Sequence, residues 1–148
     1  MSDSELTRAR LSSIGWMLQR VATTAEREMA ARLAPLGLSV LQFAVLVAVL
    51  ERPGASQAEI GGRFGQPAYA ISRALDALEA AGLVERRPDA QSRRINVVHP
   101  TETARALATQ LREIVAESNA ALTAPLSAQE RQALAGLLAR LLPHEDRR

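Results

Sequence analysis

Residues 56–99 read SQAEIGGRFGQPAYAISRALDALEAAGLVERRPDAQSRRINVVH, and this stretch decides the fold. Ser56 and Glu59 have the spacing of a capping box, which predicts a short helix that ends at Gly65. A second helix is predicted to Ala81, with Pro67 in its first turn, where a missing N–H costs nothing. Two runs rich in β-branched residues, 83–86 and 95–98, follow and predict a hairpin with a loop of several residues. A helix-turn-helix followed by such a hairpin, or wing, is typical of proteins that place one helix in the DNA major groove.

The second helix of this pair has one apolar and one polar face. Ile71, Leu75 and Leu78 recur at intervals of four and three, so this face is expected to pack on the core. The same pattern fits an ordinary solvated amphipathic helix. A phenol, a hydroxyl and a guanidinium on the opposite face are donors suited to base edges and phosphates. Asp76, also on that face, would repel phosphate and is expected to orient Arg73 or Arg63.

The hairpin is strongly basic. Arg86, Arg87, Arg93 and Arg94 surround one acid, Asp89, which leaves a local charge of +3. Arginine at a hairpin tip suits the negative potential of a narrow minor groove. A charged hairpin can also be a solubilising edge, but its position directly after a capped helix pair favours nucleic acid.

The remaining segments predict long helices around this lobe. The first is expected from Leu6 to Leu33, and an apolar helix over 40–51, opened by Ser39 and Gln42, should lie in the middle of the fold. A helix over 101–123 follows, and a last helix opens at the Ser127 capping box. The first and the last two helices carry apolar seams that predict a twofold dimer, the alternative being that they fold back on their own domain. The expected fold is mainly α (α+β), with 1–36 as N-terminal dimerisation helix, 37–100 as winged helix-turn-helix and 101–148 as C-terminal dimerisation helices.

The composition narrows the function classes. The chain has 148 residues, and its 47% hydrophobic content excludes disorder. No apolar run approaches the roughly 18 residues of a membrane span, and the N-terminus lacks the order of a secretory signal, so a cytoplasmic protein is expected. All 18 basic residues are arginine and there is no cysteine. The distant His99 and His144 predict no metal site, and no motif predicts a cofactor or an enzyme.

Several motifs resemble the MarR family of winged-helix transcription regulators. They are LSVLQF at 38–43, QAEIG at 57–61, LEAAGLVER at 78–86 and Thr101-Glu102 after the wing. The family's Asp-x-Arg at the wing is Ser92-Arg93-Arg94 here, so the bracing aspartate is absent. Tyr69 is larger than the small hydroxylated residues common at that place, so no DNA sequence preference carries over.

The resemblance implies a dimeric, sequence-specific DNA-binding regulator, a repressor of a nearby operon relieved by a small aromatic or phenolic ligand. Two recognition helices about 34 Å apart would read a near-palindromic operator. Trp16 and Arg20, one turn apart, are the candidate ligand residues, although a partly buried tryptophan and a surface arginine are the favoured interpretation of this pair. The alternative function is a winged-helix module that contacts protein rather than DNA. The candidate DNA-binding residues are Gln57, Arg63, Ala68, Tyr69, Ser72, Arg73, Arg87, Arg93 and Arg94.

Overall fold

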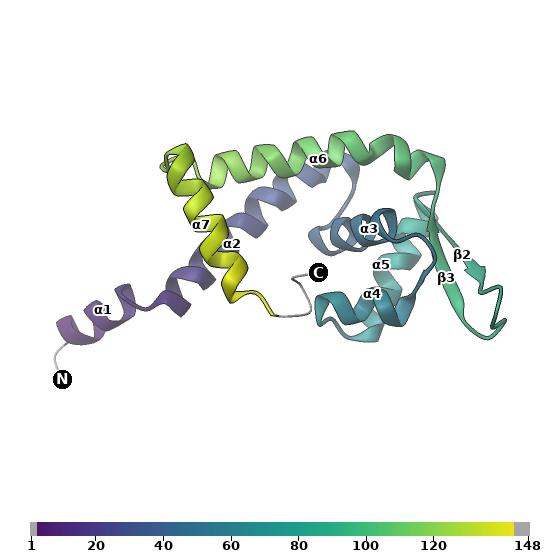
Figure 1. The fold of residues 1–148 in the computed structure, drawn as a ribbon, viewed down its shortest axis with the longest axis horizontal. Helices are drawn as coiled ribbons and strands as arrows, with labels where there is room; N and C mark the ends of the chain where they lie inside the picture. The colour runs from purple at the N-terminus through teal and green to yellow at the C-terminus, as the bar shows by residue number, and fades with distance from the viewer. Residues whose placement is uncertain (1–2, 144–148) are drawn as a thin grey trace.

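The computed structural model describes residues 3–143 and has one small sheet surrounded by helices (Figure 1). Helices α3, α4 and α5 and the strands form a lobe at one end, while α2 and α6 run out from it and α1 projects beyond them. This confirms the predicted mainly α winged helix-turn-helix with long terminal helices. The elements are α1 (Asp3–Leu11), α2 (Ile14–Leu33), a 3-10 turn (Ala34–Leu36), α3 (Val40–Glu51), β1 (Ala55–Ser56), α4 (Gln57–Phe64), α5 (Ala68–Ala80), β2 (Val84–Pro88), β3 (Asn96–Pro100), α6 (Glu102–Leu122) and α7 (Ala128–Leu141).

Local capping sets most helix boundaries. The capping boxes predicted at Ser39, Ser56 and Ser127 are all formed, each with its reciprocal glutamine or glutamate. Gly65 ends α4 in the left-handed conformation at φ 57°, which glycine adopts without steric cost. Pro67 was predicted in the first turn of α5. It is instead the N-cap residue, immediately before the helix begins at Ala68.

The prediction of one continuous first helix was wrong. The chain breaks between α1 and α2 at Ser12 and Ser13. The Ser12 hydroxyl donates to the carbonyls of Arg8 (3.0 Å) and Ala9 (3.1 Å), and the Ser13 hydroxyl accepts from the Trp16 N–H (3.3 Å). Serine side chains compete with the helical backbone for these groups, so the second serine caps a new helix although the apolar spacing continues across the break.

The sheet has three antiparallel strands in the order β1-β3-β2. The hairpin strands pair from Val84 with Pro100 to Pro88 with Asn96, one or two residues later than the sequence predicts. The two-residue strand β1 was missed, because so short a segment has no alternation to detect. It joins the sheet just before α4 and fixes the start of the helix-turn-helix.

The core surrounds α3, as predicted. Val45, Leu46 and Val49 of this helix are completely buried. The inner face of α5 packs on the same core, because Ile71, Leu75 and Leu78 are 0–1% exposed. The opposite face of α5 is therefore held outward by packing.

Apolar side chains remain exposed on the terminal helices. Ile14, Leu18 and Val21 of α2 are 40–67% exposed, and several leucines of α7 are similarly open. A cavity of about 760 Å³ lies between these faces of α2 and α7 and the end of α6. Within residues 3–143 no single helix is long and apolar enough to cross a membrane; the bent pair Ile14–Leu36 and Val40–Glu51 passes by length and composition only.

Candidate DNA-binding surface

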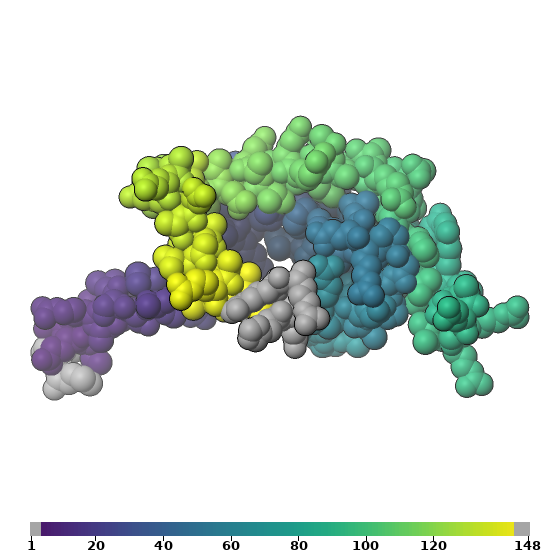
Figure 2. Space-filling view, viewed as in Figure 1, coloured from purple at the N-terminus to yellow at the C-terminus, as the bar shows by residue number. Residues whose placement is uncertain are grey.

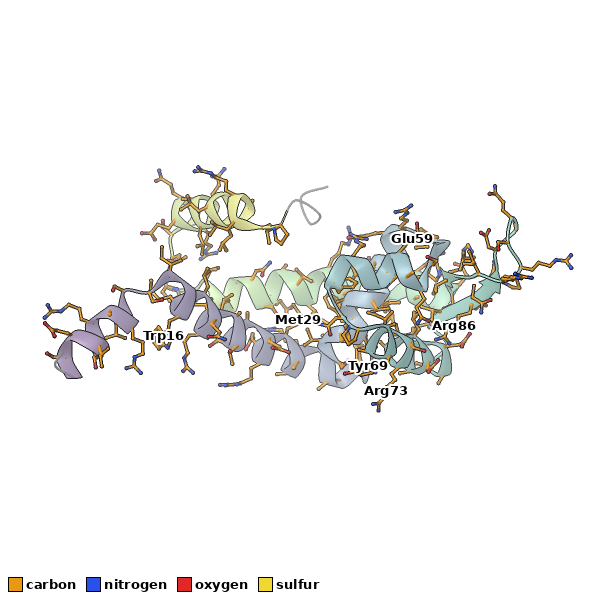
Figure 3. All side chains as sticks on the ribbon, turned by 90° about the horizontal axis from the view of Figure 1, so that it is seen from below. Trp16, Met29, Glu59, Tyr69, Arg73 and Arg86 are labelled. Atoms are coloured by element: carbon orange, nitrogen blue, oxygen red, sulfur yellow. The ribbon has the colours of Figure 1, made fainter. Side chains whose placement is uncertain are left out.

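The outer face of α5 presents unpaired donors to solvent. Tyr69 is 69% exposed, and Arg73 extends away from the helix (Figure 3). Neither side chain has a hydrogen bond or ion pair within the described residues 3–143. Ser72 is half-buried and Ala68, the first residue of the helix, is exposed. A phenol and a guanidinium one turn apart near a helix N-terminus match the arrangement that major-groove readout needs.

The two helices of the helix-turn-helix are tied at their N-termini. Gln57 is half-buried, and its Nε2 donates to the Ala68 carbonyl at 3.4 Å, so it links the start of α4 to the start of α5. The Glu59 carboxylate accepts from the Ser56 backbone N–H at 2.8 Å, and the Ser56 hydroxyl accepts from the Glu59 N–H at 3.2 Å. The Ser56 backbone and side-chain hydrogen bonds, with the nearby Arg52 cation, lower the pKa of Glu59 below its usual value.

Arg63 is less available than predicted, because an acid pairs with it. Its Nη2 lies 3.1 Å from Glu51 Oε2 at the end of α3. Arg52 is similarly paired with Glu59 at 3.3 Å. Both pairs are exposed, so each holds its arginine only weakly. Arg63 as a DNA contact stays a prediction.

The wing tip is closed by its own backbone and carries two unpaired cations. The Asp89 N–H donates to the Ile95 carbonyl (2.8 Å), and the Ile95 N–H donates to the Ser92 carbonyl (3.0 Å). Arg93 and Arg94 lie in this loop, are exposed, and have no ion pair within the part of the chain that the structure describes. Figure 2 shows the tip projecting beyond the rest of the molecule, at the end opposite α1.

Arg87 differs from the two tip arginines although it lies in the same hairpin. Its Nη2 is 2.7 Å and its Nε 3.2 Å from Oε2 of Glu85. Its side chain is 59% exposed, so a phosphate would have to compete with this carboxylate.

The expected partner of Asp76 was wrong. Asp76 Oδ1 binds Arg86 Nη2 at 2.7 Å, not Arg73 or Arg63. Glu79 binds the other terminal nitrogen of the same guanidinium at 2.8 Å. Sequence reasoning assigned Arg86 to the basic hairpin surface and missed this network, since residues seven and ten positions apart across a turn have no periodic signal.

The candidate ligand residues lie apart from the cavities. Trp16 is half-buried and its ring faces the Arg10 guanidinium, 5.4 Å from the ring centroid, rather than Arg20. Trp16 lies on the side of α2 away from α7 (Figure 3).

A second cavity of about 360 Å³ lies between α3 and α6, lined by apolar side chains with Arg112 and Glu51 among them. The ligand assignment stays a prediction.

No metal site emerges from the described residues. Over residues 3–143 no group of three or more His, Cys, Asp or Glu side chains is arranged to hold an ion. His144 lies outside the described residues.

The chain is similar in sequence and in structure to known proteins of one family. Residues 36–95 match the MarR family model. The HTH-type transcriptional repressor Rv2887 of Mycobacterium tuberculosis is 31% identical over 128 residues, 86% of this chain and 92% of its own length. The solved complex of Rv2887 with DNA has a TM-score of 0.78 at 30% identity and covers 89% of this chain and 99% of its own.

Two further solved structures are similar over most of their length. The reduced form of MarR from E. coli has a TM-score of 0.82 at 28% identity, covering 88% of this chain and 97% of its own. The transcriptional repressor CouR, bound to a 23-mer DNA duplex, has a TM-score of 0.82 at 29% identity, covering 95% and 97%. The motifs predicted a transcription regulator and not an enzyme. The chain belongs to the MarR family of winged-helix transcription regulators.

Proposed function

We propose that this chain is a dimeric, sequence-specific DNA-binding repressor, with α5 in the major groove and the β2–β3 tip in the adjacent minor groove. The observation that carries the proposal is the distribution of free cations. Arg73 on α5 and Arg93 and Arg94 on the wing are exposed and have no acidic partner within residues 3–143, whereas Arg63, Arg86 and Arg87 are paired. Cations without a partner are the ones that release counterions from DNA at least cost.

Two solved relatives support this mode of binding. Rv2887 and CouR have been solved with DNA, and both have this fold over most of their length. By analogy, α5 is the reading helix here, and Tyr69, Ser72 and Arg73 are its base-reading residues. Gln57 and Ala68, at the starts of α4 and α5, are the proposed contacts to the DNA backbone.

The exposed apolar faces support dimerisation through 1–36 and 101–148. Side chains such as Ile14 and Leu137 are 67% and 57% exposed in the single chain. A contiguous apolar surface of this kind on a soluble domain marks an interface. A twofold dimer would bury these faces and hold two copies of the 37–100 lobe about 34 Å apart, which requires a near-palindromic operator.

The cavity between α3 and α6 supports release of DNA by a small apolar anion. Phe43, Val47 and Leu111 supply apolar contacts, and the Arg112 guanidinium supplies a partner for a carboxylate. Glu51 also lines the cavity and binds Arg63 of α4, so an occupant would touch an ion pair of the DNA-binding lobe. An aromatic or phenolic acid fits this chemistry, and Trp16 with Arg20 is the second place to examine.

The direct test is capture of genomic fragments, followed by titration of a captured duplex and of a scrambled duplex of equal length. We expect retention of the captured duplex, a steep loss of affinity with salt, and a dimer in sedimentation. Aromatic acids are then titrated into the complex to find one that releases DNA. A monomer that retains no duplex at low salt would refute the proposal.

A further inference from the structure

Arg86 is the most constrained arginine of the wing. Its side chain is only 20% exposed, against 59% for Arg87 beside it. Nη1 donates to Glu79 Oε2 at 2.8 Å, and Nη2 donates to Asp76 Oδ1 at 2.7 Å and to the Ser72 carbonyl at 3.3 Å. All three acceptors belong to α5, so one guanidinium forms hydrogen bonds with three successive turns of that helix.

The backbone of Arg86 joins the same helix. Its N–H donates to Glu79 Oε1 at 3.2 Å. Strand β2 is an edge strand, because β3 pairs with it on one side only. The outward N–H of an edge strand normally faces water, so Glu79 ties the free edge of the wing to α5 with both of its oxygens.

These contacts leave Arg86 unsuited to bind phosphate, since two carboxylates already balance its charge. We infer that Arg86, held by Asp76 and Glu79, is a positioning residue for DNA recognition, which locks the wing to α5 so that both DNA-contacting elements keep one relative orientation. Figure 3 shows Arg86 between α5 and the hairpin, whereas Arg73 extends freely. The wing lacks the aspartate of the Asp-x-Arg pattern at its tip. The contacts of Arg86 with Asp76 and Glu79, called the clamp below, would instead fix the wing at its base. The inference rests on the proposed DNA-binding function and goes beyond it.

Electrostatics alone makes the opposite prediction, which makes the clamp testable. Asp76 and Glu79 are 62% and 44% exposed on the helix that would enter the groove. If they were merely solvated acids, their removal would lessen repulsion of phosphate and tighten binding. If they hold Arg86, their removal lets the wing move relative to α5 and weakens specific binding.

The test compares Asp76→Asn with Glu79→Gln, singly and together, in the full chain. Glu85→Gln is the matched control, because it removes an acid from the same hairpin. The partner of Glu85 is Arg87, whose side chain forms no hydrogen bond with α5 within residues 3–143. We measure the ratio of the Kd for a scrambled duplex to that for a captured duplex. The double variant should lower this ratio roughly tenfold, equivalent to about 1.4 kcal/mol, while Glu85→Gln should hold the ratio and tighten both complexes.

Arg86→Lys is the second variant. Lysine keeps the charge but lacks the fork that bridges two carboxylates, so it should stay impaired. A double variant that binds as tightly as Glu85→Gln would overturn the inference, and so would full activity of Arg86→Lys.

A readout without DNA separates this inference from the proposed function. Hydrogen exchange at the Arg86 amide should be faster in Glu79→Ala, which removes the acceptor of its N–H, than in the wild type, and unchanged in Glu85→Ala. Unchanged exchange in Glu79→Ala would overturn the inference even if the protein binds DNA. Absence of DNA binding by the wild type, with exchange as expected, would refute the proposed function alone.

Discussion

Replacing Arg94 by alanine tests whether the wing tip contacts DNA. The residue lies in the loop between β2 and β3, is exposed, and has no ion pair or hydrogen bond within residues 3–143. Its removal therefore deletes a charge without deleting a native contact, and the free energy of unfolding should change by less than about 0.5 kcal/mol. A change in DNA binding then reports on the interface alone.

The expected magnitude follows from counterion release. Each cation that neutralises a phosphate contributes about 0.9 to the slope of log K against log salt, and a dimer loses two such cations, so the slope should become shallower by about 1.8. Between about 50 and about 200 mM salt, that difference corresponds to a roughly 12-fold smaller loss of affinity for the variant than for the wild type.

Fluorescence anisotropy on a captured duplex, at four or more salt concentrations, measures the slope directly. Arg87→Ala is the comparison within the hairpin; its slope should change less, because Glu85 already neutralises Arg87. Arg27→Ala, on an exposed part of α2 far from α5 in the chain, is the control for a simple loss of charge. Equal slopes for Arg94→Ala and the wild type would refute the placement of the wing tip on DNA.

Four further outcomes are expected from other parts of the chain. Arg73→Ala should change which base pairs are preferred, at about 1–3 kcal/mol per lost base contact, as measured by binding to single-substituted duplexes. Ser56→Ala removes the N-cap of α4 and should lower the free energy of unfolding by about 1 kcal/mol in urea titrations. The lowered pKa of Glu59 means that its stabilising effect is present above the usual glutamate pKa and is lost as pH falls through the lowered value, so Glu59→Gln should flatten the stability profile in that acidic interval. Leu138→Asp places a charge on the apolar face of α7 and should shift sedimentation from dimer to monomer with the circular dichroism spectrum retained.

Elements that depend on short-range chemistry were predictable from the sequence. Ser39, Ser56 and Ser127 each formed the capping box that their spacing indicates, because the groups involved are at most three residues apart. The inner face of α5 was predictable for a similar reason, since helical periodicity assigns Ile71 and Leu75 to one side.

The break at Ser12 is local, but it was missed because the apolar spacing continues across it; only the contacts of the Ser12 hydroxyl with the preceding turn reveal it. Features that depend on distant neighbours were not predictable. The pairing of Asp76 with Arg86 requires the exact angle between α5 and β2, which no local pattern encodes. Arg63 shows the same limit, because its partner Glu51 belongs to another helix.

The fold concentrates unpaired positive charge at one place on a chain that is nearly neutral overall. A net charge of +2 gives no reason to expect DNA binding. Packing decides instead which arginines meet an acid. Arg86 and Arg87, at the base of the hairpin, pair with nearby acids, whereas Arg93 and Arg94 at the tip have no acidic partner within residues 3–143. Pairing at the base ties Arg86 to α5, whereas the unpaired arginines at the tip are the proposed DNA contacts. Arginine would then have two different roles within nine positions.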